Sequence, residues 1–303
     1  MPLKRPVLSI QGIIKICTLM IFISVAGISF TRAAEYPDLS EAQKTWLGQQ
    51  IFNNECNRRL ECLTAWNPGE DFPSLGIGHF IWYRENQLGI FEESFPALLT
   101  FFESENISIP AWIQAAGHEA PWQDRNEFLL AFSDSELAEL RTFLATTMTA
   151  QTTFIIIRFE AALEKILAAI PEEKGHEIAE KFYAVANSNP PYGLYALIDY
   201  VNFKGEGVAI EERYQHQGWG LLQVLENMPV NEADIMTDFV ASAKRVLQNR
   251  VQNAPVERNE TRWLQGWFNR LDSYIPTSPE ALQNDQVPVR TSTDQYDIST
   301  PAP

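Results

Sequence analysis

The residues best suited to chemistry lie close together near the start of the chain. Glu55 follows an asparagine in IFNNECNRR, and Glu70, Asp71 and Ser74 lie in the turn-rich stretch WNPGEDFPSLGIGHFIW. Two carboxyl groups in environments of different polarity are what glycoside hydrolysis requires, because one donates a proton while the other keeps its charge. Glu55 has the more apolar surroundings and is the candidate proton donor. A solvated acidic loop is the alternative interpretation of the same pattern.

The cysteines and histidines of this region indicate structural roles. Cys56 and Cys62 lie six positions apart, and in an oxidising compartment we expect them to form a disulfide; two free buried thiols are the alternative. We expect His79 to be hydrogen-bonded beneath a hairpin. The four histidines are scattered and no Cys-x-x-Cys or His-x-x-x-His pair occurs, so we predict no metal site and no cofactor.

The first 34 residues have the composition of a secretory signal peptide. Basic residues precede the apolar run 19–30, and small residues allow cleavage after Ala33 or Ala34. The run is shorter than the roughly 20 residues that span a bilayer, so a retained membrane anchor is the weaker alternative. We therefore expect a periplasmic or secreted protein that is not stably inserted in a membrane after cleavage.

The charge of the chain excludes one class of partner. The formal net charge is -16, and removal of residues 1–34 would take away four basic residues and no acidic ones. Binding to nucleic acid depends mainly on Lys and Arg, so we expect no nucleic-acid partner. The charge favours solubility, and we expect a monomer.

Periodicity and capping signals predict the elements that position these residues. Ser40 and Gln43 form a capping box for a helix over about 40–54 that ends near Glu55. Glycines and prolines interleaved with apolar residues over 66–83 predict a hairpin or a two-to-three-stranded sheet. Ser133 and Glu136 form a second predicted capping box.

Helical patterns dominate the rest of the chain. A proline-rich, apolar-poor segment from 275 to 303 is typical of a disordered tail. The domain at 35–274 is therefore α+β and mostly helical, with its β element near the N-terminus. The predicted helices span 91–105, 154–170, 177–185, 194–203, 220–225, 233–251 and 260–274.

Three stretches, in order along the chain, resemble the phage-type lysozymes and the wider lysozyme-like superfamily. The first is the Asn-Glu pair at a helix end, followed by SLGIGH at 74–79, which is similar to the family's Thr-Ile-Gly-Ile-Gly-His hairpin. The second, ALIDYVNFKGEG at 196–207, resembles its buried central helix and Gly-Glu end. The third, AKRV at 243–246 followed by Trp263 and Tyr274, is similar to its C-terminal helix pair.

This resemblance implies a lysozyme-like fold and assigns roles to the acidic stretch. Glu55 becomes the general acid, and Ser74 stands where the family has a threonine near the attacking water. Counted back from the Gly-Ile-Gly-His, the family's aspartate falls near Pro68. The acidic partner is then Glu70, which we prefer slightly, or Asp71.

Two departures from the family pattern affect the candidate acid. The interval from Glu55 to the Gly-Ile-Gly-His is longer than usual, and Glu61 competes for the role of acid. The family's arginine that pairs with the acid, just before Ala-Lys-Arg, is replaced here by Ala241 or Ser242. We expect Arg58, Arg59 or Arg245 to supply its charge.

Three further residues are candidates for substrate binding. Asn202, at the end of the predicted central helix, is placed to bind an acetamido group, with helix capping as the alternative. GWGLLQ at 218–223 resembles the Gly-Leu-Met-Gln turn of lytic transglycosylases, which share the lysozyme-like fold. Trp219 would then stack on a sugar ring, with Gln223 beside it.

The resemblance implies a muramidase that cleaves β-1,4 bonds of peptidoglycan by general acid catalysis, with either stereochemical outcome open. A lytic transglycosylase would use Glu55 alone and an intramolecular hydroxyl in place of water. A catalytically inactive peptidoglycan-binding module is the third possibility, favoured by the negative charge and the absent arginine.

Overall fold

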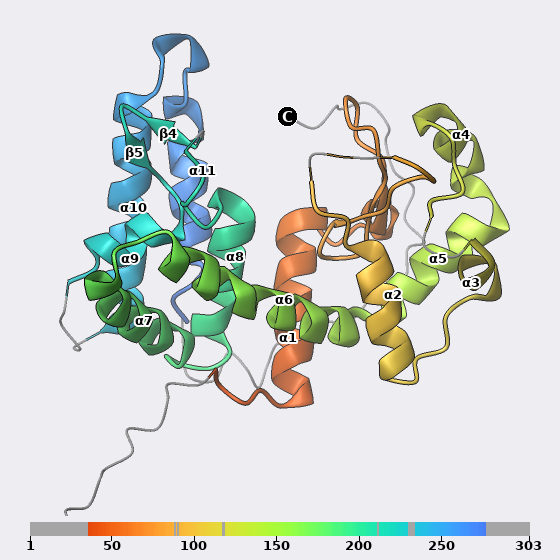
Figure 1. The fold of residues 1–303 in the computed structure, drawn as a ribbon, viewed down its shortest axis with the longest axis horizontal. Helices are drawn as coiled ribbons and strands as arrows, with labels where there is room; N and C mark the ends of the chain where they lie inside the picture. The colour runs from red at the N-terminus through yellow and green to blue at the C-terminus, as the bar shows by residue number, and fades with distance from the viewer. Residues whose placement is uncertain are drawn as a thin grey trace, which may run out of the picture. The chain divides into compact units, whose positions relative to one another are not determined.

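The computed structural model describes residues 36–87, 89, 91–116, 119–210, 212–229 and 234–276. The signal peptide predicted at 1–34, and all but the first two residues of the tail predicted at 275–303, lie outside them. The described chain is mostly helical with two small antiparallel sheets, which confirms the predicted α+β class (Figure 1). Within those ranges, no helix has both the length and the apolar character to cross a bilayer.

Helix α1 (Glu41–Cys56) carries the candidate acid in its last turn. The Ser40–Gln43 capping box is present at its start, as predicted, so both partners satisfy backbone groups that a helix end leaves unpaired. Asn57 ends the helix in the left-handed conformation. The buried side of α1 contains Trp46, Leu47, Gly48, Ile51, Phe52 and Cys56.

A three-stranded antiparallel sheet follows α1 and the short 3-10 helix η1 (Leu60–Leu63). Its strands are β1 (Thr64–Ala65), β2 (Ser74–Leu75) and β3 (Phe80–Ile81). The central strand pairs Ser74 with Ala65 on one side and with Ile81 on the other. The predicted small sheet is confirmed, but its first strand, Thr64–Ala65, lies just before the predicted range of 66–83.

The next helices pack beside this sheet. They are α2 (Phe95–Ser104), α3 (Ala111–Ala116), α4 (Arg125–Leu130), η2 (Ala131–Ser133) and α5 (Ser135–Thr146). The second predicted capping box is wrong. Ser133 lies within η2, and Asp134 is the N-cap of α5 without a side-chain hydrogen bond. The backbone turns once more before α5 begins, which moves Ser133 out of the capping position.

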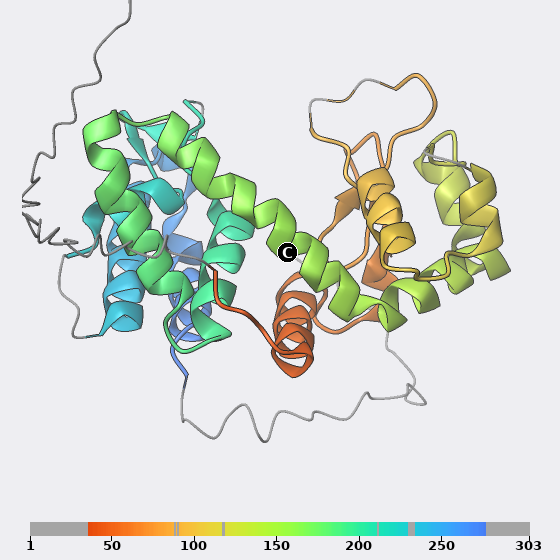
Figure 2. The ribbon, with the colours of Figure 1, turned by 60° about the horizontal axis from the view of Figure 1, so that its bottom comes forward.

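Three longer helices form the middle of the chain. Helix α6 (Met148–Ala168) crosses α1 and packs against it, as Figures 1 and 2 show, and α7 (Glu172–Ala186) packs against both α6 and α8 (Tyr192–Lys204). All three are longer than the predicted ranges. Helix α8 is buried over most of its length, as expected for a central helix.

The last segment adds a second hairpin and three helices. Strands β4 (Arg213–Tyr214) and β5 (Gln217–Gly218) precede α9 (Leu221–Asn227), and α10 (Ile235–Asn253) packs against α9 and α11 (Thr261–Asp272). The 3-10 helix η3 (Val256–Arg258) joins α10 to α11. Helices α9, α10 and α11 match the predicted helical segments, whereas the β4–β5 hairpin had no sequence signal.

Candidate functional site

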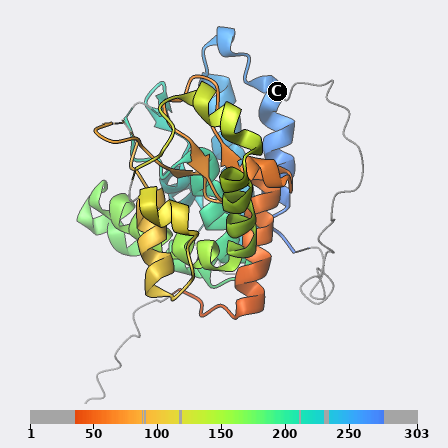
Figure 3. The same ribbon diagram turned by 90° about the vertical axis from the view of Figure 1, so that its right-hand side faces the viewer.

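Glu55 lies at the point where α1, α8 and α11 come within side-chain reach of one another. Its carboxylate accepts a hydrogen bond from Arg270 of α11 over 2.9 Å, and its side chain keeps 25% of its surface exposed. Figure 3 shows the same arrangement from the side, with the red-orange α1 next to the blue α11. The glutamate is therefore open to solvent on one side and held by a guanidinium on the other.

Arg270 is itself fixed by a buried aspartate of α8. It donates two hydrogen bonds to Asp199, over 2.8 and 2.7 Å, in the bidentate arrangement that makes such pairs strong. Tyr274 donates to the same carboxylate over 2.5 Å, and Asn54 donates to it over 2.9 Å. Asp199 thus orients Arg270, and Arg270 orients Glu55.

The electrostatics of this network follow from burial and pairing. Burial alone would lower the pKa of Arg270, but its hydrogen bonds and its attraction to Asp199 raise the pKa above the ordinary value. Burial, and the nearby charge of Asp199, raise the pKa of Tyr274 and of Tyr195. Asp199 is only 1% exposed, and its partners occupy both oxygens. It positions the site and is not available as a second reacting carboxylate.

The arginines expected to pair with Glu55 lie elsewhere, so that prediction is corrected. Arg58 donates to Asn53, and Arg245 donates to the Asn227 carbonyl and to Ser242. Arg59 is exposed at the N-terminal end of η1. The charge comes from α11, because the helix packing brings Arg270 over the end of α1. Tyr274, which the sequence had marked, lies one turn beyond Arg270.

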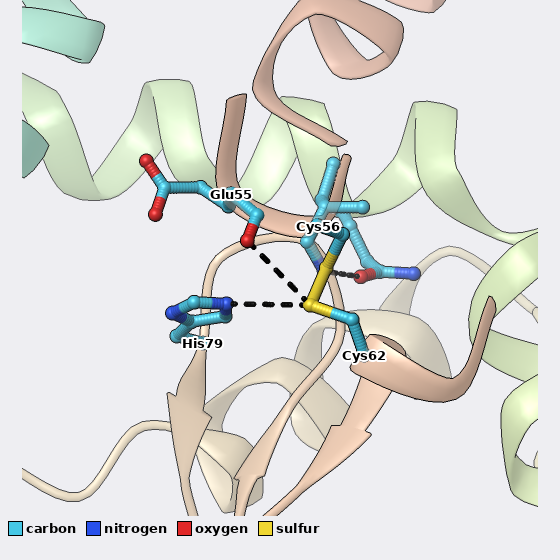
Figure 4. Close-up of a disulfide and its surroundings, with 6 residues drawn as sticks. Glu55, Cys56, Cys62 and His79 are labelled. Atoms are coloured by element: carbon cyan, nitrogen blue, oxygen red, sulfur yellow. Dashed lines mark hydrogen bonds between the residues drawn. A yellow bond between two sulfur atoms is a disulfide. The ribbon is translucent and has the colours of Figure 1, made fainter. Parts of the chain in front are cut away.

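The predicted disulfide is confirmed, and it joins the end of α1 to the start of the sheet. Cys56 and Cys62 are bonded, with 5.4 Å between their Cα atoms. The Cys62 Sγ lies 3.6 Å from the Glu55 carbonyl oxygen and 4.0 Å from Nε2 of His79 (Figure 4). Cys56, Cys62 and His79 have the spacing of a metal-ligand group, but the disulfide occupies both sulfurs. The geometry therefore indicates a structural role.

The disulfide places one end of the sheet beside Glu55. The turn at 76–79, between β2 and β3, carries His79, and in Figure 4 the Glu55 carboxylate and the His79 ring lie on the same side of the disulfide. His79 adopts a positive φ of 47° there, an uncommon conformation for a residue other than glycine. The turn end of the sheet is thus the part of the β element that adjoins the candidate acid.

The candidate acidic partners lie at the opposite end of the same strands. Glu70 and Asp71 belong to the loop between β1 and β2, whereas the turn beside Glu55 joins β2 to β3. The intervening strands are two residues long, which is roughly 7 Å of rise. Glu70 accepts a hydrogen bond from Asn67 over 3.1 Å, and Asp71 is exposed.

Ser74 lies on the central strand, between the two ends of the sheet. The residue is buried, but its hydroxyl makes no hydrogen bond to any other residue that the structure describes. The Ser74 hydroxyl has no partner among the described residues, but it is also not fully enclosed by protein, so its oxygen keeps some contact with solvent. A hydroxyl in this state is free to hold a water molecule.

The three candidate substrate-binding residues occupy different environments. Asn202 is exposed near the end of α8. Trp219 is buried, with its ring 4.7 Å from that of Tyr214 and 4.0 Å from the Arg250 guanidinium. Gln223 accepts a hydrogen bond from the Gly220 backbone and donates one to the Gly207 carbonyl. Trp219 and Gln223 therefore have full structural roles in this conformation.

Comparisons of the chain with protein-family models, curated proteins and solved structures yield no match.

Proposed function

We propose that this chain is an exported glycoside hydrolase that cleaves β-1,4 bonds of peptidoglycan, with Glu55 as general acid. The observation that carries the proposal is the restraint on Glu55. Its carboxylate is half-enclosed and is oriented by a guanidinium that is itself locked by a buried aspartate. Proton donors in enzymes need a fixed direction toward the leaving oxygen, and supporting groups of this kind provide it.

The β element supports the other half of the reaction. Glu70 or Asp71, with Ser74, would hold water or stabilise positive charge opposite Glu55. The solvent-reaching hydroxyl of Ser74 suits this role, and the Asp71 side chain is exposed to solvent.

A second candidate function is a lysozyme-like module that binds the cell wall without cleaving it. One observation favours it: the Glu55 carboxylate is already engaged by Arg270, whereas a proton donor must be free to reach the leaving oxygen.

Zymography against peptidoglycan with the purified mature protein and a Glu55→Gln variant tests the proposal. We expect Glu55→Gln to lower the rate of lysis about 100-fold or more, because general acid catalysis contributes on that scale. Glu61→Gln is the matched control, since Glu61 is the exposed competing acid of η1 and should be dispensable. Circular dichroism must show both variants folded.

The same experiment separates the alternatives. Absence of lysis by the wild type, with wall binding equal in wild type and Glu55→Gln, would contradict the hydrolase and favour the binding module. Mass spectra of the released fragments identify the chemistry: anhydro-muropeptides would select the transglycosylase in place of the hydrolase.

A further inference from the structure

Lys204, the last residue of α8, is an ammonium group without an acidic partner. The residue is 8% exposed, and its Nζ lies 3.8 Å from the ring centroid of Phe203 and 3.6 Å from that of Trp267. It makes no hydrogen bond or ion pair with any residue in the described ranges. Burying a charged group in this way is costly unless a counter-charge compensates it.

Three carboxylates in this region are bound by neighbouring arginines. Arg250 and Arg258 both bind Glu260, with Nε–oxygen distances of 2.7 and 3.0 Å. Arg270, which also contacts the Phe203 ring at 4.5 Å, is shared between Asp199 and Glu55. Lys204 is the cation left over in this cluster.

The surroundings of Lys204 lower the pKa of its side chain. Burial, together with repulsion from Arg250 and Arg270, lowers the pKa of its ammonium to about 7, although Glu260 acts in the opposite direction. The Nζ atom has no hydrogen-bond partner within the described ranges, but it is not fully enclosed by protein, so it keeps some contact with solvent. An anion can therefore reach it, and would favour the charged form.

An aromatic surface continues from Lys204 toward solvent along α11. Trp263 lies one helical turn before Trp267, with 6.1 Å between ring centroids and 31° between ring planes, and is 39% exposed. Arg262 lies over the Trp263 ring at 4.4 Å. Exposed tryptophan faces suit the apolar faces of sugar rings, since both are flat and only partly polar.

We propose that Lys204, Phe203, Trp267 and Trp263 form a subsite for a carboxylate-bearing sugar unit, or for the carboxylate of a peptide attached to it. The ammonium would bind the carboxylate, and Trp263 would support the sugar ring. One ammonium matches the single charge of a carboxylate better than the double charge of a phosphate. The shared contact with Phe203 places this subsite beside the Arg270–Glu55 pair, and the assignment rests on the proposed function.

Calorimetric titration of the full-length mature protein with three peptide-free hexasaccharides tests the subsite. The protein carries Glu55→Gln, which removes the proposed proton donor, so that no ligand is cleaved during the measurement. The first hexasaccharide alternates N-acetylglucosamine with N-acetylmuramic acid, the second is its methyl ester, and the third is uncharged chitohexaose. We expect the free acid to bind about 10-fold or more tighter than the ester, the scale of one charge-assisted hydrogen bond. A hexasaccharide carrying stem peptides, tested beside them, shows whether sugar or peptide supplies the carboxylate.

Variants assign the preference to Lys204. Lys204→Met, made in the same Glu55→Gln protein, keeps the apolar stem and should abolish the preference for the free acid over the ester. Lys204→Arg should retain most of this preference, and Trp263→Ala should weaken the binding of all ligands. Persistence of the preference in a folded Lys204→Met variant, or its absence when Lys204 is intact, would overturn the subsite.

A second measurement does not depend on the stability of a variant. Nuclear magnetic resonance of lysine side chains labelled at Cε should show the pKa of Lys204 rising when the free acid binds, and not when chitohexaose binds. An unchanged Lys204 titration with the acid bound contradicts the proposal. If no glycan binds, the proposed function itself fails, whereas equal binding of acid and ester defeats only the subsite.

Discussion

Single residues decide the electrostatics of this protein, and Glu260 is the clearest case. Its side chain has no exposed surface, yet it carries charge between two arginines and the hydroxyl of Tyr214. Burial alone would raise its pKa, but hydrogen bonds from Arg250, Tyr214 and Arg258 lower it to about 2. The folded state therefore holds this carboxylate ionised far more strongly than the unfolded chain does.

Glu260→Gln should lower the free energy of unfolding by about 3 kcal/mol at neutral pH, given the pKa of about 2 in the folded state and 4.5 in the unfolded state. The contribution is fully present above pH 4.5 and is lost as the pH falls from 4.5 toward 2. Urea unfolding of wild type and variant at several pH values should show the difference shrinking in that window. Glu257→Gln, an exposed neighbour on η3, should change stability by less than about 0.5 kcal/mol. A pH-independent difference for Glu260→Gln would disprove this account.

At the scale of elements, the packing of α7 against α8 depends on a glycine. A Cβ atom at Gly193 would lie 1.9 Å from the Val185 carbonyl oxygen and 2.6 Å from that of Ser188. Both obstacles are backbone atoms, so they cannot move aside as a flexible side chain can. The absence of a side chain at this position is what lets the start of α8 lie against the end of α7.

We expect Gly193→Ala to destabilise the protein by roughly 3 kcal/mol or more, because the helices must separate to admit the methyl group. Gly175→Ala, within α7, is the matched control. Its new Cβ would meet only a Leu167 methyl carbon at 3.8 Å, and alanine should stabilise the helix by about 0.5 to 1 kcal/mol. The midpoint temperature of thermal unfolding should fall for Gly193→Ala and rise for Gly175→Ala. Equal changes in the two variants would contradict the claim that α8 packs on α7 only because residue 193 lacks a side chain.

The sequence allowed the local parts of this architecture to be predicted. Capping and periodicity located α1, and turn residues located the small sheet, because both signals lie within a few neighbouring positions. The β4–β5 hairpin escaped because Gln215 and His216 form its turn with positive φ angles, without the usual asparagine or glycine. The sequence did not predict Arg270 as the partner of Glu55, because only the packing of α11 brings the two residues together.

For the whole molecule, net charge would govern how it meets the anionic wall of the proposed function. The formal charge of -16, which loss of the four basic residues of 1–34 would take to -20, would repel such a wall at long range, while the cations around Lys204 act only at short range. Added salt screens the long-range repulsion first, since exposed charges more than about 10 Å apart interact weakly at 0.1 M ionic strength.

Raising the ionic strength from about 10 mM to about 150 mM should therefore increase the rate of wall lysis by the proposed hydrolase, several-fold or more. Turbidity of a cell-wall suspension measures this rate, and cleavage of uncharged chitohexaose serves as the control that should change little. A rate on walls that falls with salt would show that local cations, and not the net charge, control the encounter.

The pairing of Glu55 with Arg270 also sets an order of events. The two residues are 215 positions apart, so a chain made and exported from its N-terminus presents the glutamate long before the guanidinium that directs it. Removal of the chain beyond α10 would take away Arg270, and with it that direction, although Glu55 would remain. Under the proposed function, the nascent protein is harmless to its own cell until translocation is finished and the final helix has docked.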